Sequence, residues 1–127
     1  MKIRMMCIAI FSVSSLVAQE NTLMKFDTPE KLPAHINSTN GEEGLPLVTA
    51  DGNTLFFIRS FHPENTGGSK AGQDIWYSEK NTDGSWAPAS NKLNELNNID
   101  NNAVVGISPN GYTVYLHNVY LNNKSEY

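Results

Sequence analysis

Downstream of residue 30, apolar residues occur in short clusters of aromatic and β-branched side chains, and polar residues separate one cluster from the next. Each cluster is bounded by Gly, Pro, Asn or Asp, which is typical of an all-β chain. No stretch in this region repeats its apolar positions with the helical period. The pattern therefore predicts six strands, which are Leu45–Ala50, Thr54–Ser60, Gln73–Glu79, Ser85–Ala89, Ala103–Ser108 and Thr113–Tyr120.

Two of the connections carry strong hairpin signals, Asp51-Gly52 and Asn110-Gly111. A type I′ turn needs positive φ at both central residues, and Asn or Asp followed by Gly tolerates that conformation. We therefore expect type I′ turns at both places. The side chains of Asp51 and Asn110 are expected to accept hydrogen bonds from backbone N–H groups of the turn, which is a structural role.

The segment Val48–Phe57 matches Ile107–Leu116 in chemical type at a constant shift of 59 residues, with Asn53 against Tyr112 as the clear exception. Upstream, Leu32–Asn37 similarly resembles Leu93–Asn98. The alternative is that two unrelated hairpins converged on one turn sequence. Since the chain between the hairpins has room for two more strands, one repeat contains about four strands, the size of a propeller blade.

The predicted fold is therefore all-β, with antiparallel four-stranded propeller blades, and the chain holds about one and a half blades of an incomplete β-propeller. The repeat region is expected over residues 31–127, with repeat 1 at about 31–92 and a partial repeat 2 at about 93–127. A blade buries its faces against neighbouring blades, so we expect the chain to need further blades from the same or another chain.

The N-terminal segment has the three-part pattern of a secretory signal peptide. Lys2 and Arg4 are followed by the apolar run Met5–Val17 and then by Ala18 at a cleavage position. We predict a signal peptide over residues 1–18 and an N-terminal extension over 19–30, with a buried N-terminal helix as the alternative. The mature chain would then be periplasmic or outer-membrane-associated, with no transmembrane segment after cleavage.

Composition narrows the classes of function. Cleavage would remove two of the 9 Lys and Arg residues and none of the 13 Asp and Glu residues, which makes the mature chain more acidic than the net charge of −4 of the full sequence. An acidic surface repels phosphate backbones, so no nucleic-acid partner is expected. The single cysteine, Cys7, lies in the predicted signal peptide, which excludes disulfides and cysteine-ligated metals from the mature chain.

Several segments together resemble the TolB-like, WD-like propeller repeat (Pro-Asp type) of bacterial envelope proteins. They are the hairpins Thr49–Phe57 and Ser108–Leu116, the strand Gly72–Ser78, the turn and strand Asp83–Ala89, the linker Leu93–Asn98 and the loop His62–Gly68, which is similar to that of repeats N-terminal to OmpA-like domains in Bacteroidetes. The resemblance covers roughly residues 31–120. It implies a binding propeller without chemistry of its own. The chain shows no OmpA-like domain, so peptidoglycan binding does not carry over.

The sequence favours structural roles for the most conspicuous residues and a binding role for the loops. Carboxylates Glu42 and Glu43 and the run Asp100–Asn102 leave weak calcium binding open, although neither has the EF-hand spacing. No cofactor or metal site and no catalytic residue is expected. Turn and core roles are predicted for Asp51, Gly52, Asp74, Trp76, Gly84, Trp86, Asn110 and Gly111, and binding-loop roles for His62, Glu64, Asn65, Asp100 and Asn101.

We therefore expect a non-catalytic module that presents a protein-interaction or scaffolding surface to an envelope protein or glycan. The candidate loops are Phe61–Gly72, Asn97–Asn102 and Asn37–Gly44. The histidines His35, His62 and His117 are scattered, and no Ser-His-Asp pattern surrounds any serine. Two alternatives remain open: a carbohydrate-binding or carbohydrate-processing envelope propeller with Trp76 or Trp86 as a sugar-stacking platform, and a truncated fragment without independent function.

Overall fold

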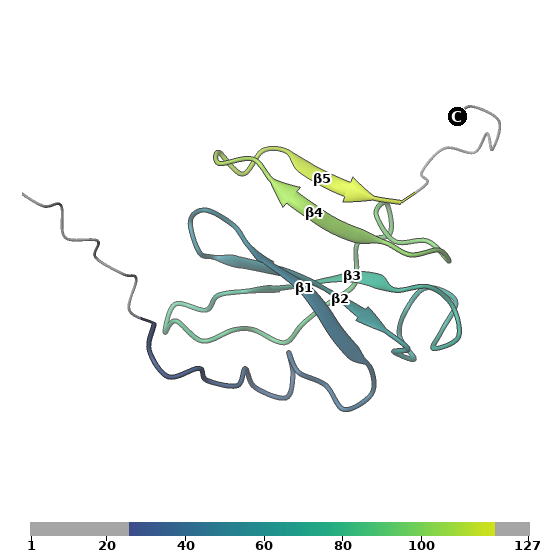
Figure 1. The fold of residues 1–127 in the computed structure, drawn as a ribbon, viewed down its shortest axis with the longest axis horizontal. Helices are drawn as coiled ribbons and strands as arrows, with labels where there is room; N and C mark the ends of the chain where they lie inside the picture. The colour runs from purple at the N-terminus through teal and green to yellow at the C-terminus, as the bar shows by residue number, and fades with distance from the viewer. Residues whose placement is uncertain (1–25, 119–127) are drawn as a thin grey trace, which may run out of the picture.

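The computed structural model describes residues 26–118, and within them it contains five strands in two antiparallel sheets and no helix (Figure 1). A three-stranded sheet has the order β1-β2-β3, and β4 pairs with β5 in a second sheet. The strands are β1 (Glu42–Val48), β2 (Thr54–Ser60), β3 (Asp74–Glu79), β4 (Ala103–Ile107) and β5 (Val114–His117). The predicted all-β class is confirmed. The predicted signal peptide, the extension up to residue 25 and residues 119–127 lie outside the described residues.

The two hairpins repeat in register as well as in sequence. Both also carry a register irregularity that ends at equivalent residues, between Gly44 and Leu47 in β1 and between Val104 and Gly106 in β4. The described chain therefore contains a true structural repeat of one hairpin. Three cross-strand pairs of β1–β2 recur 59 residues later in β4–β5: Gly44↔Ile58 as Ala103↔His117, Leu47↔Phe56 as Gly106↔Tyr115, and Val48↔Leu55 as Ile107↔Val114.

The hairpin connections differ from the predicted type I′ turns. Gly52 has a φ of 74°, but Asp51 is not among the residues with positive φ, and the same holds for Gly111 and Asn110. The loop is longer than two residues, because the Thr49 N–H donates to the Thr54 carbonyl at 2.9 Å. A four-residue loop lets Gly52 alone take the left-handed conformation.

The expected fourth strand of the first repeat, Ser85–Ala89, does not form a continuous strand. Two isolated bridges, Lys80↔Trp86 and Tyr77↔Ser90, tie this segment to β3 and its C-terminal end. Pro88 has no N–H to donate to a ladder, so regular pairing is interrupted between the two bridges. The observed sheet therefore has three strands, and the segment after β3 follows its edge without completing a fourth.

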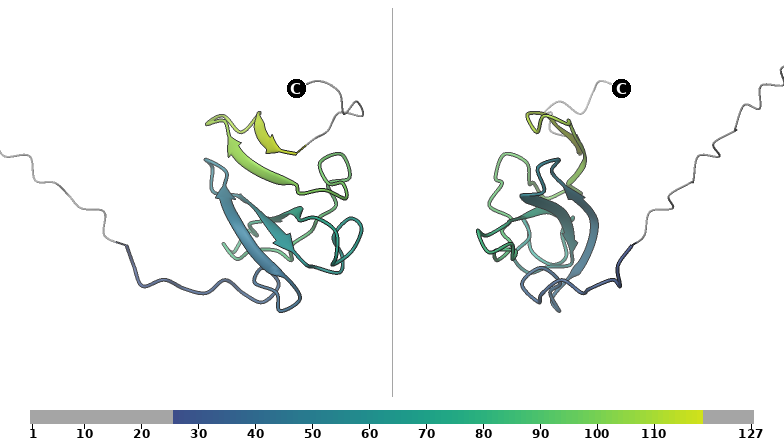
Figure 2. Two further views of the ribbon diagram at one scale, coloured as in Figure 1. Left: turned by 45° about the vertical axis from the view of Figure 1, so that its right-hand side comes forward. Right: turned by 90° about the vertical axis from the view of Figure 1, so that its left-hand side faces the viewer.

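The two faces of the three-stranded sheet are covered by different parts of the chain (Figures 1 and 2). The β4–β5 hairpin lies against one face, and the segments before β1 and after β3 lie along the other. On this second face Leu55 and Phe57 of β2 and Trp76 of β3 pack with Ile36, because alternate residues of a strand share a face. Leu32, Trp86 and Ala89 pack against this cluster from the flanking segments.

Candidate interaction surface

Two of the predicted binding loops lie side by side in the structure. The Gly72 N–H donates to the Ile99 carbonyl at 3.1 Å, and the Gln73 N–H donates to the side-chain oxygen of Asn101 at 3.3 Å. The approach is so close that a Cβ on Gly72 would lie 2.1 Å from the Asp100 carbonyl oxygen. We call residues 61–72 and 97–102 together the loop surface. The third predicted loop, 37–44, approaches the first loop at His62, because a Cβ on Gly41 would lie 3.3 Å from the Cβ of His62.

Each half of the loop surface exposes one large apolar side chain. Phe61 is 60% exposed and Ile99 is 67% exposed. Among the predicted binding residues, Glu64, Asp100 and Asn101 are exposed, whereas His62 and Asn65 are buried. The exposed side chains of the loop surface therefore include two large apolar groups, carboxylates, an amide and the cation of Lys70.

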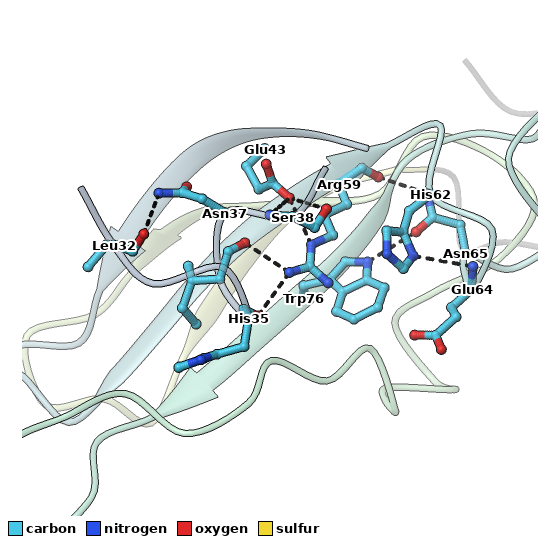
Figure 3. A network of polar contacts seen from close by, with 11 residues as sticks. Leu32, His35, Asn37, Ser38, Glu43, Arg59, His62, Glu64, Asn65 and Trp76 are labelled. Carbon is cyan, nitrogen blue, oxygen red and sulfur yellow. Dashed lines mark hydrogen bonds and ion pairs between the residues drawn. The ribbon is translucent and has the colours of Figure 1, made fainter. Parts of the chain in front are cut away.

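Asn65 holds the first loop from beneath (Figure 3). Its side-chain nitrogen donates to the Arg59 carbonyl at 2.8 Å, and its side-chain oxygen accepts from the indole N–H of Trp76 at 3.0 Å. Since all four polar positions of a buried amide must find partners, these bonds fix both the loop and the tryptophan. Trp76 is buried, in agreement with its expected place in the core.

Asp74 joins the same loop to the linker that follows the first repeat. Its Oδ2 accepts from the Thr66 N–H at 2.8 Å, the Thr66 hydroxyl at 3.1 Å and the Asn91 amide at 3.2 Å. Its Oδ1 is the one buried side-chain polar atom of residues 26–118 for which no hydrogen-bond partner is found. A buried carboxylate with three donors on one oxygen is a bracket between loops, which is the role expected for it.

Two buried asparagines hold the second loop, and sequence reasoning missed both of them. Asn97 pairs with the backbone of Ile75 like a neighbouring strand, accepting from its N–H at 2.8 Å and donating to its carbonyl at 2.9 Å. Asn102 donates through its backbone to the Gln73 carbonyl at 2.8 Å and through its side chain to the Asp100 carbonyl at 2.7 Å. At Gln73 and Ile75 the backbone is satisfied in this way without a strand.

Arg59 is a third residue that the sequence did not single out. Its guanidinium is buried over the Trp76 ring, 4.1 Å from the ring centroid, and its Nε donates to Glu43 Oε1 at 3.1 Å (Figure 3). A second nitrogen donates to the carbonyls of His35 and Ile36 at 3.1 and 2.8 Å. Burial lowers the pKa of Arg59, while Glu43 raises it. Arg59 thus ties the turn before β1 to the sheet.

His62 packs edge-on against Trp76, with ring centroids 4.8 Å apart, and its Nδ1 accepts from the Glu64 N–H at 3.2 Å. An accepting Nδ1 means that the ring is neutral and carries its one N–H proton on Nε2. Burial lowers the pKa of His62, and the nearby Arg59 charge lowers it further. The buried imidazole therefore has a packing role, as an aromatic ring under the loop surface.

The remaining predicted residues take positions in turns and at the margin of the core. Asp51 and Asn110 bracket their hairpins identically: each accepts from the N–H two residues later, at 3.1 and 3.2 Å. Gly84 has a φ of 86° in the turn after β3. Trp86 is half-buried, and Lys80 Nζ lies 4.8 Å from its ring centroid.

Residues 26–118 contain no group of three or more His, Cys, Asp or Glu side chains that could hold a metal ion. Glu43, one of the carboxylates considered for calcium, instead accepts from Arg59 and from the Ser38 N–H and hydroxyl. No helix in the same range is long and apolar enough to cross a membrane.

Comparisons with known proteins leave the family open. No protein-family model, no curated protein and no solved structure matches this chain.

Proposed function

We propose that this chain is an exported, non-catalytic β-propeller repeat module that binds a partner of the bacterial cell envelope through the loop surface. The observation that carries the proposal is the pairing of residues 61–72 with 97–102. These loops come from different repeats and are held together by the contacts of Gly72 with Ile99 and of Gln73 with Asn101. Loops positioned by a sheet scaffold are the usual carriers of specific binding.

The loop surface has the composition of a protein-binding patch. Its large apolar side chains, Phe61 and Ile99, are exposed to water, which is unfavourable for apolar surface. A partner that buries them would therefore be stabilised by the hydrophobic effect. Buried side chains beneath them, Asn65 and Asn97, limit the motion of both loops. A preorganised surface loses little conformational entropy when it binds.

The repeat architecture supports the scaffold part of the proposal. Three cross-strand pairs and the turn bracket of one hairpin recur 59 residues later, together with a register irregularity that ends at equivalent residues. Repetition of one supersecondary unit is the basis of propellers and other stacked folds. Together with the resemblance to TolB-like repeats and the predicted signal peptide, it favours a binding role in the periplasm or at the outer membrane.

The experiment compares the immobilised full chain with the double variant Phe61→Ser/Ile99→Ser. Cell-envelope extract and purified peptidoglycan are passed over both. Val48→Ser, which changes an exposed apolar residue of β1 outside the loop surface, is the matched control. We expect a specific envelope protein or glycan to be retained by the parent chain and the control and to be lost from the double variant. Equal retention by all three chains, or by none, would overturn the proposal.

A further inference from the structure

Three of the four strand edges at which the described sheets end are closed to further pairing. At β3, the backbone of Ile75 pairs with the Asn97 side chain, and Tyr77 forms a bridge with Ser90. The edge strand β1 contains Pro46 and a register irregularity, and the edge strand β4 contains an irregularity as well. Proline and bulges are common devices that keep an edge strand from pairing with another chain.

The fourth edge, that of β5, is regular and open among residues 26–118. β5 pairs with β4 alone, and its four residues include no proline, Asp, Glu, Lys or Arg. The Ser108 N–H donates to the Thr113 carbonyl at 2.9 Å, so Thr113 directs its backbone polar groups toward β4. Because successive residues of a strand direct these groups to opposite sides, Val114 and Leu116 direct theirs away from β4. An incoming strand therefore finds two N–H donors and two carbonyl acceptors on β5.

The first repeat shows what pairs at the equivalent edge. β2 is the equivalent of β5, and along its second edge it pairs with β3 in antiparallel register. In that pairing Phe56 lies directly opposite Tyr77, with ring centroids 6.4 Å apart. Tyr115 occupies the position of Phe56 and is 58% exposed. Since aromatic pairs across two strands stabilise a sheet, the equivalence favours a strand with an aromatic residue opposite Tyr115.

The open edge begins beside the loop surface. Asn118, which follows β5 directly, donates to the side-chain oxygen of Asn98 at 2.9 Å and also to that of Asn102. Both acceptors belong to the second loop of the loop surface. β5 lies on the outer side of β4, away from the three-stranded sheet (Figures 1 and 2). A polypeptide that contacts the loop surface can therefore continue along β5 without a break.

We infer that β5 binds an extended segment of the partner protein as an added antiparallel strand, with an aromatic side chain opposite Tyr115. The backbone groups of Val114 and Leu116 supply the hydrogen bonds, and Tyr115 supplies the preference for sequence, which is the usual division in strand addition. This inference rests on the proposed function, because it identifies the partner as a protein and states how it continues from the loop surface.

The probe for this site is a fluorescein-labelled peptide with the sequence of residues 72–81, which contains β3. Fluorescence anisotropy follows its binding to the full chain, and saturable binding is expected. Ser78 and its alternates face β2 in the structure, whereas Glu79 faces the other way and accepts from the Ala87 N–H. A peptide with Ser78→Pro loses a donor toward β5 and is expected not to bind, and a peptide with Glu79→Pro is the matched control that still binds.

Variants of the full chain test the same contact from the other side. Val114→Pro removes an N–H that faces away from β4, at an edge position where sheets tolerate proline, and is expected to abolish binding. Tyr115→Thr is expected to weaken binding about twofold to fivefold, and Tyr112→Thr, at a side chain that is 91% exposed, is the matched control. Circular dichroism checks that each variant is folded. On peptide binding, hydrogen exchange should slow at Val114 and Leu116.

Three outcomes would overturn the inference: no saturable binding of the peptide, equal binding of the Ser78→Pro and Glu79→Pro peptides, or unchanged exchange at Val114 and Leu116. The variant Phe61→Ser/Ile99→Ser is expected to bind the peptide as the parent chain does, because neither residue lies on β5. Failure of the peptide with intact retention of an envelope partner strikes this inference alone. Lost retention with intact peptide binding strikes the proposed function and leaves the strand site on β5 standing.

Discussion

Arg59 and Asn118 occupy equivalent positions of the two hairpins, and the residues that accept their side-chain hydrogen bonds are also equivalent. Arg59 donates to Glu43, and Asn118 donates to Asn102. The first repeat thus uses an ion pair between the buried Arg59 and the half-buried Glu43 where the second uses two amides. Both pairs close the open end of a hairpin against the linker that precedes it. The repeat therefore extends from the turn brackets to the polar contacts that dock each hairpin.

The ion pair gives the first prediction. Arg59→Met keeps a long apolar side chain beside Trp76 and removes the charge, which leaves two backbone carbonyls without their donor and Glu43 with only its donors from Ser38. Breaking a buried pair from one side costs about 3 kcal/mol of unfolding free energy. Urea denaturation of the full chain measures it, and Asn118→Ala at the equivalent position is the matched control, with an expected loss of about 1 kcal/mol. If Arg59→Met and Asn118→Ala lost the same free energy of unfolding, the ion pair would contribute no more to stability than the amide pair, which contradicts the prediction.

The buried imidazole of His62 gives a prediction on pH. Because burial and Arg59 lower its pKa below the usual 6.5, the folded chain holds His62 neutral where the unfolded chain already takes up a proton. The unfolded state then binds more protons, so the free energy of unfolding falls as pH drops below 6.5. The pKa values of Asp51 and Asp83 are also lowered, but from 3.8, so their effect belongs to a more acidic range.

The measurement for His62 is the urea midpoint between pH 7.5 and pH 5. The parent chain is expected to lose stability steadily below pH 6.5, whereas His62→Phe, which preserves the edge-on ring contact with Trp76, is expected to show a flatter profile. A parallel slope in both chains would mean that another group causes the pH dependence.

The hairpins were predictable from the sequence because their signals are local. Asp51-Gly52 and Asn110-Gly111 specify a reversal of the chain wherever they occur, and both brackets form as expected. The predicted type I′ turn was wrong, because the length of a hairpin loop depends on which two residues form its last cross-strand hydrogen bond. Thr49 and Thr54 close it across four residues, and no dipeptide signal contains that choice.

The buried asparagines that hold the second loop could not be predicted from a local signal. An asparagine-rich linker such as 91–102 has the composition of a solvated loop, yet Asn97 and Asn102 are buried. Their burial follows from the unpaired edge of β3, which exists only after the sheet has formed. The strand expected at Ser85–Ala89 failed for a related reason, since pattern alone did not weigh the missing N–H of Pro88.

The contact between the two loops gives the third prediction. A methyl group on Gly72 would lie 2.1 Å from the Asp100 carbonyl oxygen, and the Gly72 N–H is hydrogen-bonded to the Ile99 carbonyl of the same loop. Gly72→Ala is expected to cost about 2 kcal/mol and to abolish partner retention by the loop surface. Gly44→Ala is the matched control, because its Cβ would meet Ile58 at an ordinary 3.4 Å. Thermal unfolding and the retention assay together check the prediction, which fails if the two variants behave alike.

The fourth prediction concerns Asn97, whose amide occupies the position of a missing strand. Asn97→Ala leaves the N–H and the carbonyl of Ile75 buried without their partner, which costs about 2 to 3 kcal/mol for two orphaned backbone groups. Asn94→Ala, in the exposed part of the same turn, is expected to change stability by less than about 0.5 kcal/mol. Hydrogen exchange separates a local from a global effect: the Ile75 amide should lose protection more than the amides of β2. If the Ile75 amide keeps its protection in Asn97→Ala, water or a neighbouring group takes over the bond, and the asparagine does not substitute for a strand.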